Sequence, residues 1–201
     1  MKKQVVVIHG GDTFSTYKEY ISFLKNYKID FGRLKKRGWK EGLSEKLGRG
    51  FEVLAPKMPN ARNARYFEWK IWFRKFLPHI RNRVVLVGHS LGGIFLAKYL
   101  SENRFPKKIK GVFLVAAPHD DKDSDHSLAD FVLPRNLKRL EKQSGRIFIY
   151  HSKDDPIVPF TDFKKYVKAL ARARAAAFKN RGHFAQEEFP EIVKDIKSLF
   201  K

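Results

Sequence analysis

The chain of 201 residues contains no cysteine, which excludes disulfide bonds and metal sites built from thiolates. It also lacks a long apolar run. The run at residues 5–8 is too short for the core of a signal peptide, although the charged start Met1-Lys2-Lys3 precedes it. No stretch has the length needed to cross a membrane. We therefore expect a cytoplasmic protein, with a core supplied by its 43% hydrophobic residues.

Acidic side chains are also scarce. There are 21 Asp and Glu residues against 42 Lys and Arg, which gives a net charge of +21. The excess is concentrated in residues 1–117, which hold 25 basic and 8 acidic residues. Such a field could attract nucleic acid, anionic lipid headgroups or anionic substrates. No nucleic-acid-binding motif accompanies the charge, so we favour a solvated, lysine-rich surface and treat nucleic acid or an anionic surface as the less favoured partner.

Apolar runs alternate along the chain with segments of helical periodicity. Several runs are continuous rather than alternating, as in strands buried on both faces. The predicted strands are Gln4–His9, Phe51–Ala55, Val84–Gly88, Gly111–Ala116, Ile147–His151 and Ala173–Phe178; the predicted helices are Thr16–Asn26, Leu34–Leu47, Arg65–Leu77, Ile94–Asn103, Pro134–Lys142, Phe160–Ala171 and Pro190–Phe200. This order favours an α/β fold, a three-layer sandwich in which a mostly parallel sheet of about six strands is flanked by helices.

The segment Gly88-His89-Ser90-Leu91-Gly92-Gly93 lies between a predicted strand and a predicted helix. Its G-x-S-x-G spacing is typical of a nucleophile elbow, a sharp turn whose glycines leave no side chain to clash with the neighbouring strand or helix. The turn lifts the Ser90 hydroxyl above the sheet, and the N-terminus of the following helix favours an oxyanion there. The alternative is a glycine-rich turn that holds an inert serine.

A serine nucleophile needs a base, and the base needs a group to orient it. In this architecture the chain order is Ser, then Asp or Glu, then His. Asp155 stands four residues before Pro159 in the loop after strand 147–151, and we prefer it over its neighbour Asp154, whose alternative role is to form a turn. His183 is the only histidine after Asp155, so chain order selects it as the base.

The loop after the first strand carries His9-Gly10-Gly11. In such folds this loop supplies one backbone donor of the oxyanion hole, and the residue after the nucleophile supplies the other. We assign these donors to Gly11 and Leu91, with Asp12 as the neighbouring alternative to Gly11, and expect His9 to be structural. The candidate residues for contact with substrate are Asp12, His89, Phe14 and Phe131, although the elbow geometry turns the His89 side chain away from Ser90.

We expect a single domain over residues 1–201, with a basic helical insertion at about 18–50. The insertion is longer than an ordinary crossover, and we expect it near the mouth of the site with Trp39 on its inner side. In the predicted helix 65–77, Phe67 and Ile71 fall on overlapping faces with Trp72 and Phe76, so we expect core positions for these side chains.

Residues 119–126, His-Asp-Asp-Lys-Asp-Ser-Asp-His, contain side chains that can bind metal ions. Their spacing matches no calcium loop, and the glycine that such a loop uses to turn is missing. The sequence therefore predicts a polar loop over the site, and we expect neither a metal nor another cofactor.

Together these motifs resemble the α/β-hydrolase superfamily and, within it, the small retinoblastoma-binding-protein-9/YdeN-like serine hydrolases. The resemblance covers nearly the whole chain and is carried by residues 6–10, 88–93, 116–118, 152–159 and 182–184. It implies esterase-type activity on small acyl substrates, with Ser90, Asp155 and His183 as the triad. The basic segment 18–50 is not part of the shared pattern, so the substrate is not carried over with the fold.

We therefore expect a serine hydrolase of the carboxylesterase type that cleaves esters of small to medium acyl groups. The alternative is a catalytically weak binding module of the same fold whose basic surface binds nucleic acid, anionic lipid or a protein partner. A third, less favoured possibility is a related reaction of the same triad, such as cofactor-free peroxidation or acyl transfer. Serine rather than aspartate at position 90 argues against dehalogenase-type chemistry.

Overall fold

A computed structural model describes residues 1–122 and 127–201 of the chain. Its centre is one sheet of six strands in the order β2-β1-β3-β4-β5-β6, and every neighbouring pair is parallel. The strands are β1 Lys3–Ile8, β2 Phe51–Leu54, β3 Val84–His89, β4 Ile109–Val115, β5 Arg146–Ser152 and β6 Arg174–Phe178. The predicted α/β fold with a parallel six-stranded sheet is thus confirmed, and the predicted strand positions are correct within two residues.

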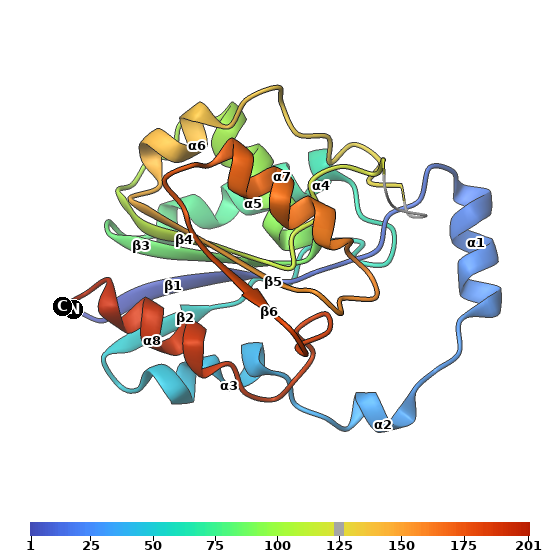
Figure 1. Cartoon of the computed structure of the whole chain (residues 1–201), viewed down its shortest axis with the longest axis horizontal. Helices are drawn as coiled ribbons and strands as arrows, with labels where there is room; N and C mark the ends of the chain where they lie inside the picture. The colour runs from blue at the N-terminus through green and yellow to red at the C-terminus, as the bar shows by residue number, and fades with distance from the viewer. Residues whose placement is uncertain (123–126) are drawn as a thin grey trace.

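Helices cover both faces of this sheet (Figure 1). The helices are α1 Tyr17–Asn26, α2 Phe31–Leu34, α3 Trp39–Leu47, α4 Tyr66–Phe76, α5 Leu91–Glu102, α6 Lys138–Gln143, α7 Phe160–Ala169 and α8 Pro190–Ser198, with a 3-10 turn at Leu77–His79. Helices α4, α5, α6 and α7 pack on one face, and α3 and α8 on the other. None of the helices in the described ranges is long and apolar enough to span a membrane.

The continuous apolar runs in the strands follow from this double cover. In β1, Val6 and Ile8 belong to the core under α4 and α5, whereas Val5 and Val7 belong to the core under α3 and α8. Successive side chains of a strand point to opposite faces, so a strand with helices on both sides needs apolar residues at every position.

The predicted helix 34–47 is wrong, because the chain forms two helices separated by residues 35–38. Gly38 has an extended backbone (φ −89°, ψ 171°) and precedes the first residue of α3. Glycine is a weak helix former, and a helix across this segment would place the cations Lys36 and Lys40 four residues apart on one face, where like charges repel. Trp39, at the start of α3, is buried and faces inward as expected.

The predicted buried face of α4 is also wrong. Phe67 and Ile71 are exposed, whereas Tyr66, Trp69 and Phe73 are buried. Seven of the eleven positions of this helix are aromatic or apolar and they are spread around it, so periodicity alone does not identify the inner face. It is decided by tertiary contacts: Trp69 packs edge-on against Phe95 of α5, and so does Phe73.

Parallel strands place their carboxyl ends at one edge, where ligands bind in open α/β sheets. The chain leaves β1 toward β2 on one side and returns to β3 on the other, so the carboxyl ends of β1 and β3 form the point where the strand order reverses. Ser90 follows β3 directly at this point.

Replacement of Gly92 by alanine tests the close packing at this edge. A Cβ at Gly92 would lie 2.3 Å from the carbonyl oxygen of Ile8, so Gly92→Ala is expected to lower the free energy of unfolding by roughly 1–3 kcal/mol. Gly42→Ala is the matched control, because its Cβ meets nothing within 4 Å in the middle of α3. Alanine there should stabilise by about 0.5–1 kcal/mol. Urea unfolding measures both; equal effects would contradict the packing argument.

Candidate active site

Ser90 occupies a strained turn between β3 and α5. Its backbone has φ 55° and ψ −125°, a region that residues with a Cβ seldom adopt. The turn is held because the Ser90 amide donates to the Val115 carbonyl at 2.8 Å and the Ser90 carbonyl accepts from the Gly93 amide at 2.8 Å. A Cβ at Gly88 would lie 2.3 Å from the Gly92 carbonyl oxygen, so the strand and helix can approach this closely only with glycine here.

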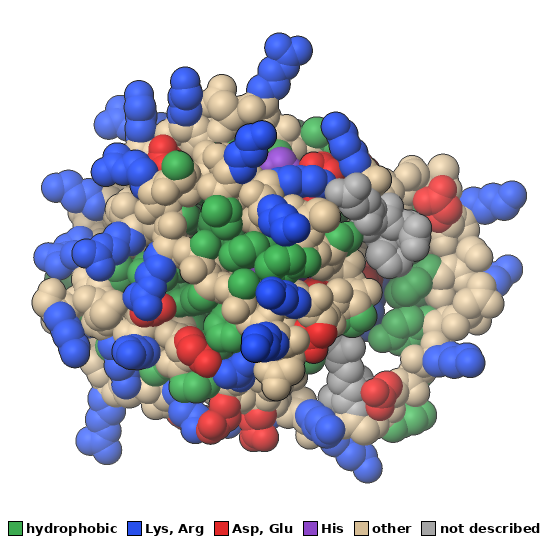
Figure 2. Space-filling view, in the orientation of Figure 1, with side chains coloured by type: hydrophobic (Ala, Val, Ile, Leu, Met, Phe, Trp, Pro, Cys, Tyr) green, Lys and Arg blue, Asp and Glu red, His purple; other side chains and the backbone are tan. Residues whose placement is uncertain are grey.

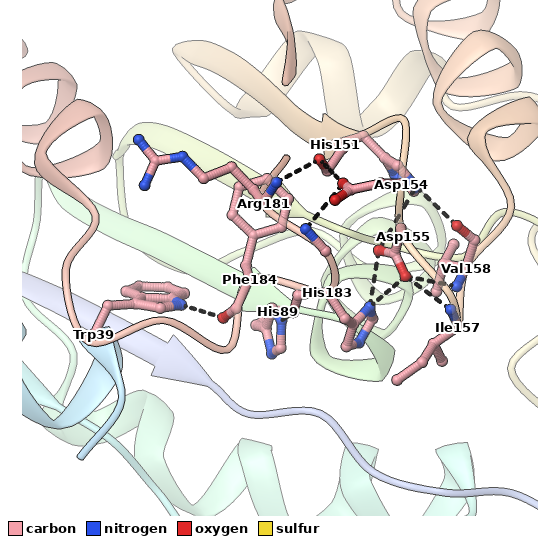
Figure 3. Close-up of polar contacts among 12 residues, drawn as sticks. Trp39, His89, His151, Asp154, Asp155, Ile157, Val158, Arg181, His183 and Phe184 are labelled. Atoms are coloured by element: carbon pink, nitrogen blue, oxygen red, sulfur yellow. Dashed lines mark hydrogen bonds and ion pairs between the residues drawn. The ribbon is translucent and has the colours of Figure 1, made fainter. Parts of the chain in front are cut away.

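His183 and Asp155 are brought together from different loops (Figure 3). Nδ1 of His183 lies 2.9 Å from Oδ2 and 3.1 Å from Oδ1 of Asp155. The Asp155 carboxylate is completely buried, and its Oδ1 also accepts from the amides of Ile157 at 2.9 Å and Val158 at 3.0 Å. Donation from Nδ1 to a carboxylate leaves Nε2 of a neutral imidazole free to accept a proton.

Asp154 has a different set of partners from its neighbour. Its Oδ1 accepts from the Ser152 hydroxyl at 2.5 Å and from the Gly182 amide at 3.0 Å. The hydrogen bond from Ser152, followed by that from the Gly182 amide, lowers the pKa of Asp154. Ser152 in turn accepts from the Arg181 amide at 2.9 Å. Asp154 thus holds the backbone just before His183, whereas Asp155 contacts the imidazole itself.

Helix α3 and the end of β3 hold the other side of the His183 loop. Trp39 donates from its indole Nε1 to the Phe184 carbonyl at 3.0 Å, and its ring packs edge-on against His89. Nε2 of His89 donates to the His183 carbonyl at 2.9 Å, while its Nδ1 accepts from Lys40 at 3.2 Å. The rings of His89 and His183 have centroids 4.9 Å apart.

The contacts of His89 differ from those predicted for a substrate-binding residue. Both of its ring nitrogens are engaged by protein atoms, the side chain is buried, and among the described residues it is not one of those that line the cavity at Ser90. It supports the loop that carries His183.

The loop after β1 backs the serine. A Cβ at Gly10 would lie 3.0 Å from Cβ of Ser90. Nε2 of His9 accepts from the Met58 amide at 2.8 Å and its Nδ1 contacts the Gly10 carbonyl at 2.5 Å, which fixes this loop and agrees with a structural role. The amide of Asp12 donates to the Ala61 carbonyl at 2.8 Å, so it is already engaged.

Gly11 and Leu91 lie beside each other at the cavity, where a Cβ at Gly11 would be 3.3 Å from Cδ2 of Leu91. In the described part of the chain the Gly11 amide has no backbone acceptor, and the Leu91 amide is the first of α5 and therefore has none within the helix. Two donors next to one serine, one of them at the positive end of a helix, can stabilise an anion.

A cavity of about 260 Å³ opens at Ser90. Its walls are mostly apolar and combine four loops with α1 and α7; they are formed by Gly11, Asp12, Thr13, Phe14, Phe23, Ser90, Leu91, Pro118, Asp120, Leu128, Ile157, Val158, Pro159 and Asp162. Asp12 and Phe14 are thus at the cavity, and their contact with substrate stays a prediction. Phe131 is fully buried against Trp69 and, within the described ranges, is absent from these walls, so its predicted place at the substrate is wrong.

Sequence reasoning placed Asp120 in a polar loop over the site but missed a second carboxylate in the wall of this cavity, that of Asp162. Asp162, in the first turn of α7, is buried and accepts from the His119 amide at 2.9 Å and from Lys165 at 3.1 Å. Burial raises the pKa of Asp162. Lys165 also donates to Asp120 at 2.8 Å; although burial acts in the opposite direction, hydrogen bonds from Lys165 and His119 lower the pKa of Asp120 to about 2. A carboxylate at a helix start is common, so only its burial singles out Asp162.

Of the segment 119–126, whose side chains include types that can bind metal ions, residues 123–126 lie outside the described part of the chain. Within the described ranges, no group of three or more His, Asp or Glu side chains has an arrangement that could hold a metal ion.

Comparisons with known proteins agree with this geometry. The model of a family described as serine hydrolase matches residues 31–197. The chain is 28% identical to the serine hydrolase RBBP9 of Rattus norvegicus over 165 residues, 81% of this chain and 84% of that protein. It is 28% identical to the hydrolase YdeN of Bacillus subtilis (strain 168) over 190 residues, 94% and 89% of the two chains.

The fold itself is shared with solved structures. The crystal structure of the B. subtilis ydeN gene product superimposes with a TM-score of 0.79 at 22% identity and covers 99% of both chains. Est1E from Butyrivibrio proteoclasticus has a TM-score of 0.60 at 14% identity, over 99% of this chain and 87% of that one. At these identities the likeness concerns the fold alone.

The buried His151 and the half-buried His9 should make stability depend on pH. Burial lowers the pKa of His9 and of His151 below 6.5, the latter despite Asp155 and Asp162 nearby. Below pH 6.5 the unfolded chain therefore binds protons on these rings that the folded chain does not, and the free energy of unfolding falls as the pH drops.

Urea unfolding at several pH values between neutral and mildly acidic measures this effect. We expect His9→Gln and His151→Gln each to flatten the dependence of unfolding free energy on pH, whatever they do to its absolute value. The exposed His79 provides the control, since His79→Gln should leave the slope unchanged. An unaltered slope in both the His9 and the His151 variants would contradict the assignment.

Proposed function

Because the chain belongs to the serine hydrolase family, we propose that it cleaves carboxylic esters through a triad of Ser90, His183 and Asp155. The observation that carries the proposal is the hydrogen bond between a buried, amide-bonded carboxylate and Nδ1 of His183, whose ring centroid lies 4.9 Å from that of His89, the residue before the strained Ser90. A structural histidine would have no need of such an orienting group, whereas a general base does.

In the proposed mechanism Ser90 Oγ attacks the ester carbonyl carbon, and His183 Nε2 takes the hydroxyl proton. Asp155 holds the imidazole in the required tautomer and stabilises the imidazolium. Collapse of the tetrahedral intermediate releases the alcohol, which receives the proton from His183. Water, activated by the same imidazole, then hydrolyses the acyl-enzyme and restores the serine.

The amides of Gly11 and Leu91 are the proposed donors to the oxyanion. Each is backed by rigid structure, one by the close contact of its loop with Ala61 and the other by α5. Donors fixed before the reaction stabilise developing charge without reorganisation, and the loss of one such donor typically costs about 10²–10³ in rate.

The cavity favours acyl groups of small to medium size. Its volume of about 260 Å³ lies just below the range of typical ligand sites, roughly 300–1,000 Å³. Phe14, Leu128 and Val158 supply apolar surface to the cavity wall, while Asp120 and Asp162 make another part of the wall polar. We propose that the acyl chain occupies the apolar part.

The first test is covalent labelling with a fluorophosphonate probe, followed by turnover of p-nitrophenyl esters of increasing chain length. The wild type should be labelled, and Ser90→Ala and His183→Ala should not be, with ester turnover falling by at least about 10³-fold because nucleophile and base act together. Ser44→Ala, an exposed serine of α3, is the matched control and should behave as wild type. Labelling or turnover that persists in folded Ser90→Ala would refute the proposal.

Asparagine variants of the two aspartates distinguish their roles. Asp155→Asn should lower kcat by about 10⁴-fold, because the amide disfavours the tautomer that leaves Nε2 free. Asp154→Asn alters a carboxylate that only accepts hydrogen bonds from Ser152 and Gly182, so kcat should fall less than about tenfold. Steady-state kinetics of both variants on one ester decides the assignment, and the reverse order of effects would make Asp154 the acid.

A further inference from the structure

Residues 15–37 form an arm that contains α1 and α2 and connects β1 to α3. Helix α1 contains no buried residue, and it stands apart from the two helical layers at the edge of the molecule (Figure 1). A helix of ten residues without a buried face is only marginally stable in water, so contacts beyond its own backbone must support it.

The inner side of the arm reaches the catalytic cavity. Phe14, directly before the arm, and Phe23 of α1 both line the cavity that contains Ser90. Their ring centroids are 5.0 Å apart, and Phe14 also packs against Tyr20 at 5.6 Å. Any displacement of α1 therefore changes the wall of the cavity.

The arm also exposes large apolar side chains. It presents five large side chains to solvent, with exposed fractions of 69% for Tyr17, 45% for Leu24, 45% for Tyr27, 60% for Ile29 and 70% for Phe31. Tyr17 and Leu24 are seven residues apart and thus share one face of α1. Single exposed apolar residues are ordinary, but five within fifteen consecutive residues mark a contact surface.

The charge of the arm indicates the partner. Residues 15–37 hold seven Lys and Arg but only Glu19 and Asp30 as acids, and exposed Lys18, Lys25 and Lys28 alternate with the apolar side chains. Figure 2 shows hydrophobic and basic side chains together on this part of the surface. Aromatic and aliphatic side chains combined with cations match the boundary between anionic headgroups and acyl chains. Phosphates of a nucleic acid would satisfy the lysines but offer nothing to Leu24 or Ile29.

We propose that the arm docks on an anionic lipid surface and that docking shifts α1, so that the cavity at Ser90 opens to an acyl ester held in that surface. The docking itself does not depend on the triad; only the choice of a lipid-borne ester rests on the proposed function.

Binding is tested with Ser90→Ala, which carries the intact arm and turns over no substrate. The protein is co-sedimented with vesicles of phosphatidylcholine alone or mixed with phosphatidylglycerol. We expect it to bind the mixed vesicles and to leave them as salt rises. Lys25→Glu with Lys28→Glu, and separately Leu24→Ser with Ile29→Ser, should each weaken binding by at least about tenfold, because both charge and apolar contact contribute.

Matched control variants make the same changes in net charge and in exposed apolar surface at sites outside the arm. Lys138→Glu with Lys142→Glu alters two exposed lysines of α6, and Phe67→Ser with Ile71→Ser removes exposed apolar groups of α4. Both control variants, made in the Ser90→Ala chain, should bind the mixed vesicles as tightly as Ser90→Ala itself. Docking through the arm is overturned if the protein ignores anionic vesicles at low salt, or if the controls lose as much binding as the arm variants. Retained binding by folded arm variants overturns it equally.

The opening step is tested in the chain with Ser90 present. The arm variants should hydrolyse a water-soluble short ester at the wild-type rate, yet lose about tenfold or more of the rate on the same ester carried on a lipid in mixed vesicles. Equal rates on vesicles would overturn the coupling of docking to the site. If the wild type hydrolyses neither ester although vesicle binding behaves as expected, the proposed function fails and the docking surface stands.

Discussion

The contact on which the rest of the site depends is the close approach of Gly92 to the end of β1. Its missing side chain lets α5 start against the carbonyl of Ile8, which brings the Ser90 turn against Gly10. The same approach sets the amides of Leu91 and Gly11 beside one serine. One steric constraint at the reversal point of the sheet therefore supplies both the strained serine and the donors next to it.

The opposite half of the site is built from loops, and it is held by pairs of contacts rather than by close packing. The backbone before His183 is fixed by Asp154, and that after it by Trp39. His89 donates a hydrogen bond to the carbonyl of His183 itself, and Asp155 accepts one from the imidazole of His183. These contacts come from β3, from α3 and from the loop after β5, so the position of one imidazole depends on three separate parts of the fold. This division explains why two adjacent aspartates and two neighbouring histidines have different roles.

The segment between β1 and β2 connects this centre to the exterior. Its end, at Trp39 and Lys40, packs behind His183, while its middle, at Phe23, forms a wall of the cavity. Part of the basic charge that is so prominent in the sequence, seven Lys and Arg against two acidic residues in residues 15–37, thus lies on a segment that touches the site from two sides. Solubility alone would not require that placement, which is why we connect the charge to the surface on which the protein works.

Local pattern determined much of this protein. Continuous apolar runs indicated buried parallel strands. The spacing of glycines around Ser90 predicted its sharp turn, and chain order selected Asp155 and His183, which the structure joins by a hydrogen bond. Periodicity could not decide which face of α4 is buried, because apolar residues are spread around that helix, nor that His89 would support a loop and Phe131 the core. The burial of Asp162 and the contact of Phe23 with the cavity depend on segments far apart in sequence. Only the tertiary structure could decide them, since a side chain's environment is set by what packs against it.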